Sequence, residues 1–156
     1  MMSRPLFYSL IALTLAACTD GTLLHSYKPL PKEGWDRHDT IRFEVPQVET
    51  DIEGTLFIGL RTTANIGYQD IVLAVEQRYD APAAYRCDTI HYPLADAEGY
   101  ALTSGVNFHQ YETQHIPINL QKGQSCSISI HHLMRHEVMH GIKEVGIKVG
   151  KLNEKN

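Results

Sequence analysis

One short stretch near the end of the chain has the residue types and spacing of a metal site. Residues 136–140 read His-Glu-Val-Met-His, so that two histidines lie four positions apart and a glutamate follows the first. On a helix, histidines at this spacing share one face and can bind Zn²⁺, while the glutamate polarises a metal-bound water. Taken alone, His136, Glu137 and His140 therefore predict a zinc-dependent hydrolase.

The surrounding sequence argues against this prediction. Gly141 interrupts a helix one residue after the second histidine, and a β-like run begins at Ile142. A catalytic zinc site also takes a third protein ligand. The longer form of the motif supplies a glycine and then a histidine downstream, where this chain has Lys143 and Gly146. We therefore expect solvated side chains on a short turn and predict no catalytic residue, metal or cofactor. The alternatives are a zinc hydrolase and an adventitious or structural metal site.

The N-terminus predicts where the protein resides. Arg4 precedes an apolar run over residues 6–15, which is too short to span roughly 30 Å of hydrocarbon. Ala16 and Ala17 then lead into Cys18, as in the bacterial lipobox. Residues 1–17 are predicted to be a cleaved lipoprotein signal peptide, and Cys18 the lipidated residue that anchors the chain in the cell envelope, facing the periplasm. The alternative is an ordinary signal peptide with an incidental Cys18.

The other two cysteines leave two interpretations open. In an oxidising periplasm, Cys87 and Cys126 are candidates for a disulfide. Each also lies in a strand-like run, and separation in sequence does not give the Cα distance on which a disulfide depends. Two small side chains packed in the core are the alternative.

Short β-rich segments must position all of these side chains. Apolar and polar residues alternate with period two, which is typical of strands with one buried face. The expected strands span residues 41–45, 55–62, 71–79, 85–92, 109–120, 125–130 and 142–149. Pro117 predicts that its strand lies at a sheet edge, because proline cannot donate to a ladder. The strand over 125–130 is expected to be central.

The same alternation predicts the core and the fold class. It places Phe43, Ile58, Leu73 and Ile147 inside and Arg42, Glu44 and Lys148 outside. No connection is long and amphipathic enough for a parallel α/β fold, so the chain is predicted to be all-β, an antiparallel, jelly-roll-like β-sandwich. We expect a tether over residues 18–33, the sandwich over 34–151 and a polar tail over 152–156.

Several segments, taken in order, resemble the GldH family of gliding-motility lipoproteins. The segments are Tyr27-Lys28-Pro29-Leu30-Pro31 before Gly34-Trp35, Leu56-Phe57-Ile58-Gly59-Leu60-Arg61, Asp88-Thr89-Ile90 with Tyr92-Pro93-Leu94-Ala95, and Gly141-Ile142 with Val145-Gly146-Ile147. The resemblance runs from about Leu24 to Val149. In this comparison, residues 136–140 fall in a variable stretch.

The resemblance implies a non-catalytic envelope lipoprotein, needed for surface movement in gliding bacteria and associated with machinery that overlaps type IX secretion. Its expected partners are the membrane, through lipid on Cys18, and an envelope protein that the sequence does not identify. The formal net charge of −4 and the lack of a basic run argue against nucleic acid as a partner.

Overall fold

The computed structural model describes residues 21–64, 66–105, 108–112 and 115–151, and within them it contains strands and no helix. The predicted signal peptide, Cys18 and the tail over 152–156 lie outside these ranges. The strands are β1 (Thr22–Pro29), β2 (Trp35–Asp36), β3 (Ile41–Val45), β4 (Ile52–Thr63), β5 (Asp70–Tyr79), β6 (Ala84–Pro93), β7 (Phe108–Glu112), β8 (Ile116–Leu120), β9 (Cys126–His132), β10 (Val138–Met139) and β11 (Ile142–Lys151). The described part therefore offers no helix long and apolar enough to cross a membrane.

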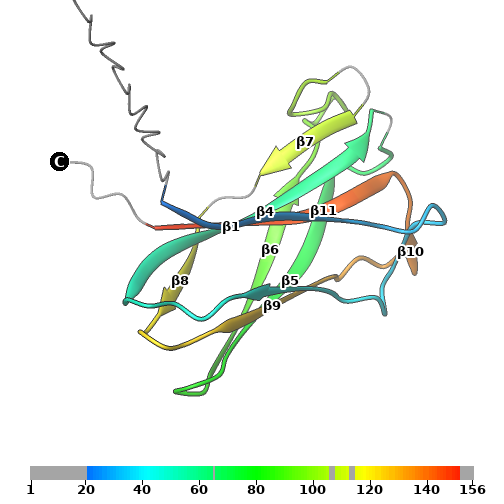
Figure 1. Cartoon of the computed structure of the whole chain (residues 1–156). Helices are drawn as coiled ribbons and strands as arrows, with labels where there is room; N and C mark the ends of the chain where they lie inside the picture. Colours follow the sequence, from blue (N-terminus) through cyan, green and yellow to red (C-terminus); the bar gives the residue numbers. More distant parts are fainter. Residues whose placement is uncertain (1–20, 65, 106–107, 113–114, 152–156) are drawn as a thin grey trace, which may run out of the picture.

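Two antiparallel sheets form the layers of a sandwich. One has the strand order β1-β11-β4-β7, with β8 also paired to β4, and the other has the order β3-β9-β5-β6. Figure 1 shows β1, β4 and β11 grouped in one layer and β5, β6 and β9 in the other. A short ribbon of β2 and β10 completes the fold. The predicted all-β, antiparallel architecture is confirmed.

The core lies between the sheets and draws on both of them. Phe43, Ile58, Leu73 and Ile147, which the alternation places inside, are at most 2% exposed. Burial of one such side chain stabilises the fold by about 1.5–3 kcal/mol. Because these four residues come from four different strands, their burial holds the two sheets together.

Pairing explains where the strands differ from expectation. The single strand expected over 109–120 is two strands, β7 and β8, which pair with the two halves of the long strand β4. Pro117 lies in β8, which pairs with β4 alone, so the predicted edge position is confirmed. The central position of β9 between β3 and β5 is also confirmed.

The expectation of a tether up to residue 33 was wrong for residues 22–29. These residues form β1, which pairs with β11 at the edge of the five-stranded sheet. The sandwich therefore begins at Thr22, well before Trp35. The cause is that β1 is held by its backbone pairing and by the packing of Tyr27, neither of which produces an apolar alternation along the sequence.

Candidate functional site

The stretch over 136–140 contains no helical turn, because His136 and Glu137 lie in a bend and the next two residues in a strand, so the helix that a zinc motif requires is missing. Val138 and Met139 form β10, which pairs with β2, and Met139 is fully buried. His136 and His140 line one shallow hollow, in which the ring of His136 lies 5.7 Å from that of Tyr68. Residues 135–137 bend, and the pairing of β10 with β2 makes Val138 and Met139 a strand where solvated residues of a turn were expected.

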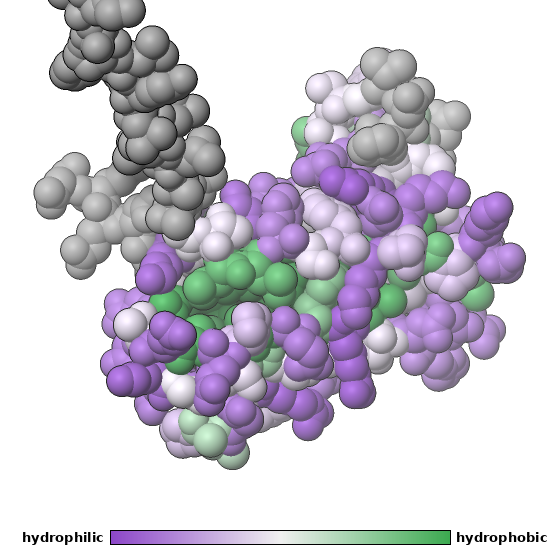
Figure 2. All heavy atoms as spheres, viewed as in Figure 1, coloured by the Kyte–Doolittle hydropathy of each residue, from purple (hydrophilic) through white to green (hydrophobic). Residues whose placement is uncertain are grey.

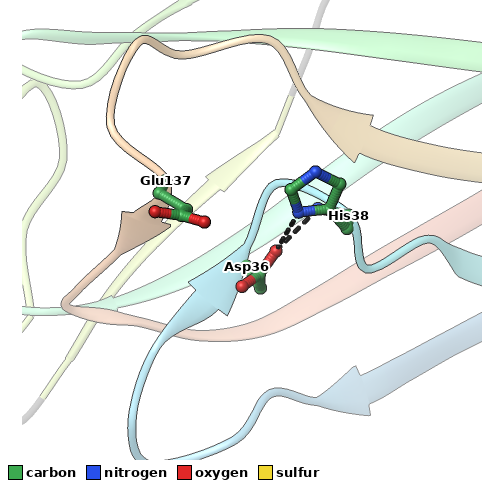
Figure 3. A group of neighbouring side chains, drawn as sticks. All are labelled: Asp36, His38 and Glu137. Carbon is green, nitrogen blue, oxygen red and sulfur yellow. Dashed lines mark hydrogen bonds and ion pairs between the residues drawn. The ribbon is translucent and has the colours of Figure 1, made fainter.

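Glu137 lies in a different group from the two histidines. Its carboxylate is near Asp36 and His38, with all ligand atoms of the three within 4.8 Å, and this is the only such group within the described ranges. Figure 3 shows Glu137 directly before the strand β10, on the side of the Asp36–His38 pair. A water on a metal held by His136 and His140 would therefore not have Glu137 beside it, and the zinc hydrolase is not supported.

A turn explains why Asp36 and His38 of this group lie close together. Asp36 Oδ1 accepts a hydrogen bond from the His38 amide at 2.8 Å and lies 2.9 Å from His38 Nδ1. These bonds lower the pKa of the Asp36 carboxyl. The His38 and Asp36 side chains are 77% and 39% exposed, and Glu137 is exposed too, so solvent surrounds the group. Exposed acidic groups of this kind are common without an ion.

The two cysteines do not form a disulfide, so the first of the two interpretations is wrong. Cys126 on β9 pairs with Tyr79, and Cys87 on β6 pairs with Glu76, so the two thiols lie on opposite flanks of β5. Cys126 is buried, which raises its pKa to about 12, whereas Cys87 is exposed. The core position expected of both in the alternative holds for Cys126 alone.

Strand β6 presents the most open edge of the sandwich. It pairs over ten residues with β5, without a register shift, and no other described strand pairs with it. The other edge strands are shorter, and two of them carry protection, a bulge in β1 and Pro117 in β8. Native proteins usually block exposed edges with such devices, because an open edge is a template for another strand.

The pairing pattern shows which backbone groups of β6 are free. Val72 on β5 directs both backbone groups to the β9 side. Its C=O accepts a hydrogen bond from Leu133 N at 2.8 Å, and its N–H donates to Met134 Sδ at 3.3 Å. Because backbone direction alternates along a strand, Leu73 and its partner Ile90 bond to each other. The residues that direct N–H and C=O outward are therefore Tyr85, Cys87, Thr89 and His91. Within the described residues, these groups have no hydrogen-bond partner.

A groove of about 690 Å³ runs beside this edge, between β6 and the strands β7 and β8. Its buried wall is aromatic, because Tyr92 and Tyr111 meet edge to face with ring centroids 6.3 Å apart. Tyr111 donates a hydrogen bond to the Leu94 carbonyl at 2.9 Å. These contacts position the aromatic wall of the groove.

The groove also carries an ion pair on its β6 side. Arg86 Nε and Asp88 Oδ2 lie 2.6 Å apart, with Nη2 and Oδ1 at 2.9 Å, so the pair is bidentate. The hydrogen bond to Asp88 raises the pKa of the Arg86 guanidinium. Both charges point to the groove side, and the outward backbone lies next to them.

A second, apolar surface lies at the start of β1. Figure 2 shows hydrophobic atoms gathered in a band on the visible face, bordered by polar side chains. A hollow of about 240 Å³ between β1 and the β3–β4 connection is lined in part by Leu23, Val45, Val48 and Ile52. The two sheets are therefore not closed over the core along this side.

The open edge of β6 leaves only a weak signal in the sequence. Sequence reasoning missed the free edge of β6, although residues 84–91 lack the apolar face that the other strands show. That lack is a usable signal, since a strand without a continuous apolar face is poorly covered. Of the aromatic residues, Trp35, Tyr92 and Tyr111 are buried, and Tyr100 is 73% exposed.

Known proteins resemble this chain in sequence and, weakly, in structure. A curated relative, the gliding motility lipoprotein GldH of Flavobacterium johnsoniae, is 20% identical over 148 residues, which cover 90% of this chain and 91% of the relative. The mosquito-larvicidal Cry4Aa toxin from Bacillus thuringiensis has a TM-score of 0.45 at 9% identity, over 82% of this chain and 21% of the toxin chain. Eiger TNF from S. frugiperda has a TM-score of 0.35 at 10% identity, over 70% and 65%. Structural similarity at this level says nothing about the function of this chain.

The decisive similarity is that to a family model. Residues 22–149, from the first residue of β1 to a position near the end of β11, match the model described as GldH lipoprotein. This range includes both sheets, the open edge of β6 and the histidine motif over 136–140. The chain belongs to the GldH lipoprotein family.

Proposed function

We propose that this lipoprotein serves gliding motility without catalysing a reaction, by holding a further envelope protein molecule, whether a different protein or a second copy of itself, close to the membrane. Its family makes it a membrane-anchored protein of the cell envelope. The relative named for gliding motility supports the cellular role. The separation of Glu137 from the hollow of His136 and His140 supports a non-catalytic role. A connection with type IX secretion is supported by the family resemblance alone.

The observation that carries the proposal is the open edge of β6. An extended segment of another protein can add to such an edge, with affinity from backbone hydrogen bonds and specificity from side-chain pockets. Tyr85, Cys87, Thr89 and His91 supply the free backbone groups, and the neighbouring groove supplies the pocket.

The anchor would keep the sandwich near the bilayer. β1 begins at Thr22, four positions after Cys18. A chain of this length spans at most about 14 Å even when fully extended. With lipid on Cys18, the sandwich is therefore held against the membrane surface without a long spacer. Cys18→Ser should abolish incorporation of labelled fatty acid, and unchanged labelling would contradict this anchor.

A single backbone substitution tests the edge. Thr89→Pro removes an outward N–H and leaves the bonds between β5 and β6 in place, because the backbone of Thr89 does not take part in them. Thr89→Ala is the matched control, since it keeps the N–H. In a strain whose gliding depends on this protein, we expect Thr89→Pro to abolish spreading and Thr89→Ala to preserve it, at equal abundance. Full spreading with Thr89→Pro would refute the role of this edge.

A further inference from the structure

We infer that the strand added to β6 is β6 of a second copy of this chain, paired antiparallel about a two-fold axis at Cys87. This inference rests on the proposed function, since it names the protein that occupies the same edge. In a C2 dimer the same patch meets itself, so the edge must be complementary to its own sequence. The residues of β6 meet this condition.

Backbone direction restricts the alignments that are available. Only residues with outward N–H and C=O groups can form the new hydrogen-bonded pairs, and these are Tyr85, Cys87, Thr89 and His91. An axis at Cys87 pairs Cys87 with its own copy and Tyr85 with Thr89 of the second copy. All of these pairs join outward residues, as a continuous ladder requires.

Charge selects this alignment among its neighbours. With the axis at Cys87, Arg86 lies directly opposite Asp88 of the second copy, and the reciprocal pair forms as well. An axis at Asp88 would set two carboxylates opposite each other, and an axis at Arg86 would set two guanidinium groups opposite each other. Opposite charges stabilise cross-strand pairs and like charges destabilise them. Within one chain Arg86 and Asp88 already form an ion pair, and at 44% and 26% exposed they can extend this pair to the same residues of the second copy.

Membrane attachment makes a small interface sufficient. A paired strand buries less surface than a stable soluble dimer needs, but attachment to one surface raises the effective concentration of the two copies. Both Cys18 anchors reach the same membrane when the two-fold axis stands along the membrane normal. The sheets then lie along the surface, which the short connection from Cys18 to Thr22 allows.

Oxidative crosslinking of the full lipoprotein in native membranes tests the pairing. A hydrogen-bonded antiparallel pair places Cα atoms about 5.5 Å apart, within the range of about 4.4–6.8 Å for disulfides. With copper phenanthroline and dissolved oxygen, the two Cys87 thiols give one disulfide, and their two protons and two electrons go to oxygen as hydrogen peroxide. We expect a disulfide-linked adduct of twice the chain mass, which Cys87→Ser abolishes.

Two further cysteine variants test the register, both in the Cys87→Ser background. Thr89→Cys alone should give little adduct, because Thr89 faces Tyr85 of the second copy. Tyr85→Cys combined with Thr89→Cys should give the adduct again. A stronger adduct from Thr89→Cys alone than from Cys87 would overturn the proposed alignment.

Charge exchange supplies a test that does not depend on cysteine chemistry. Arg86→Asp places carboxylates opposite each other and should reduce the Cys87 adduct at least tenfold, and adding Asp88→Arg should restore it. Loss without restoration would overturn the charge argument. If Cys87 crosslinks to a different protein and not to its own copy, the second-copy inference fails and the proposed function stands. If oxidation gives no adduct and Thr89→Pro has no effect on spreading, both fail.

Discussion

The ring of Tyr27 on β1 lies across Gly146, its register partner on β11. It continues over Gly59, the partner of Gly146 on β4, so one aromatic ring covers two glycines on the outer face of the sheet. The guanidinium of Arg61 lies 4.0 Å from the centre of this ring and forms an ion pair with Glu144 at 2.6 Å. Because neither glycine has a side chain, the Tyr27 ring packs directly on the sheet and holds β1 on the sandwich.

Gly146→Ala should displace Tyr27 and loosen β1. The added Cβ would lie 2.5 Å from Tyr27 Cδ1, closer than real carbon contacts. We expect a loss of about 1–3 kcal/mol in the free energy of unfolding, measured by urea denaturation. Gly67→Ala is the control, because no atom lies within 4 Å of its added Cβ, and it should change stability by less than about 0.5 kcal/mol. Equal losses of stability in both variants would contradict the packing of Tyr27 against Gly146.

Core and surface positions of the strands should respond very differently to truncation. Ile58→Ala and Leu73→Ala remove fully buried side chains, so each should cost about 2–5 kcal/mol. Arg42→Ala and Glu44→Ala lie on the exposed face of β3 and should stay within about 0.5 kcal/mol. Chemical denaturation of the four variants measures the difference, and similar losses in both sets would mean that the register is wrong.

Stability should fall at mildly acidic pH because of His132. This side chain is 2% exposed, its Nε2 lies 3.0 Å from the Trp35 carbonyl, and its Nδ1 has no partner among the described residues. Burial lowers its pKa, and Arg37 adds to the effect. Below about pH 6.5 the unfolded chain takes up a proton that the folded chain resists, so the free energy of unfolding drops by up to about 1.4 kcal/mol per pH unit.

The variant His132→Gln isolates this group from the other histidines. Glutamine keeps a donor for the Trp35 carbonyl and does not titrate. Urea unfolding at several pH values between 5 and 7.5 should show a shallower decline for His132→Gln than for the unmodified protein. Parallel curves would show that His132 titrates alike in both states.

The two thiols of the folded body should differ in reactivity. Cys87 is exposed, whereas burial raises the pKa of Cys126 to about 12 and keeps it protonated. In the mature lipoprotein in detergent, a maleimide should therefore modify Cys87 quickly and Cys126 only after unfolding, as mass spectrometry of the peptides would show. Rapid native modification of Cys126 would contradict its core position.

The histidine motif should be dispensable. His136→Ala combined with His140→Ala, or Glu137→Gln alone, should leave gliding unchanged at normal abundance, because these residues do not converge on one point. Purified protein should also retain less than one equivalent of zinc after dialysis. A tightly held equivalent of zinc, lost on replacing the histidines, would reverse this conclusion.

Local periodicity determined most of the long strands and the core positions within them. A strand buries every second residue, so Phe43, Ile58, Leu73 and Ile147 are marked as core by their immediate neighbours in the sequence. The edge position of β8 follows in the same way from Pro117, whose missing N–H is a property of one residue. The family resemblance also rests on short segments read in order.

Tertiary pairing decided the rest. Tyr27 finds its place through glycines on β11 and β4, and the two cysteines are parted by β5, so neither outcome follows from neighbouring residues. Residues 136–140 carry a helical spacing of histidines, but they contain a bend and the strand β10, whose pairing with β2 brings Glu137 close to Asp36 and His38. The open edge of β6 likewise exists only because no described strand pairs with it. Each of these depends on contacts between residues distant in the chain, which a local pattern does not encode.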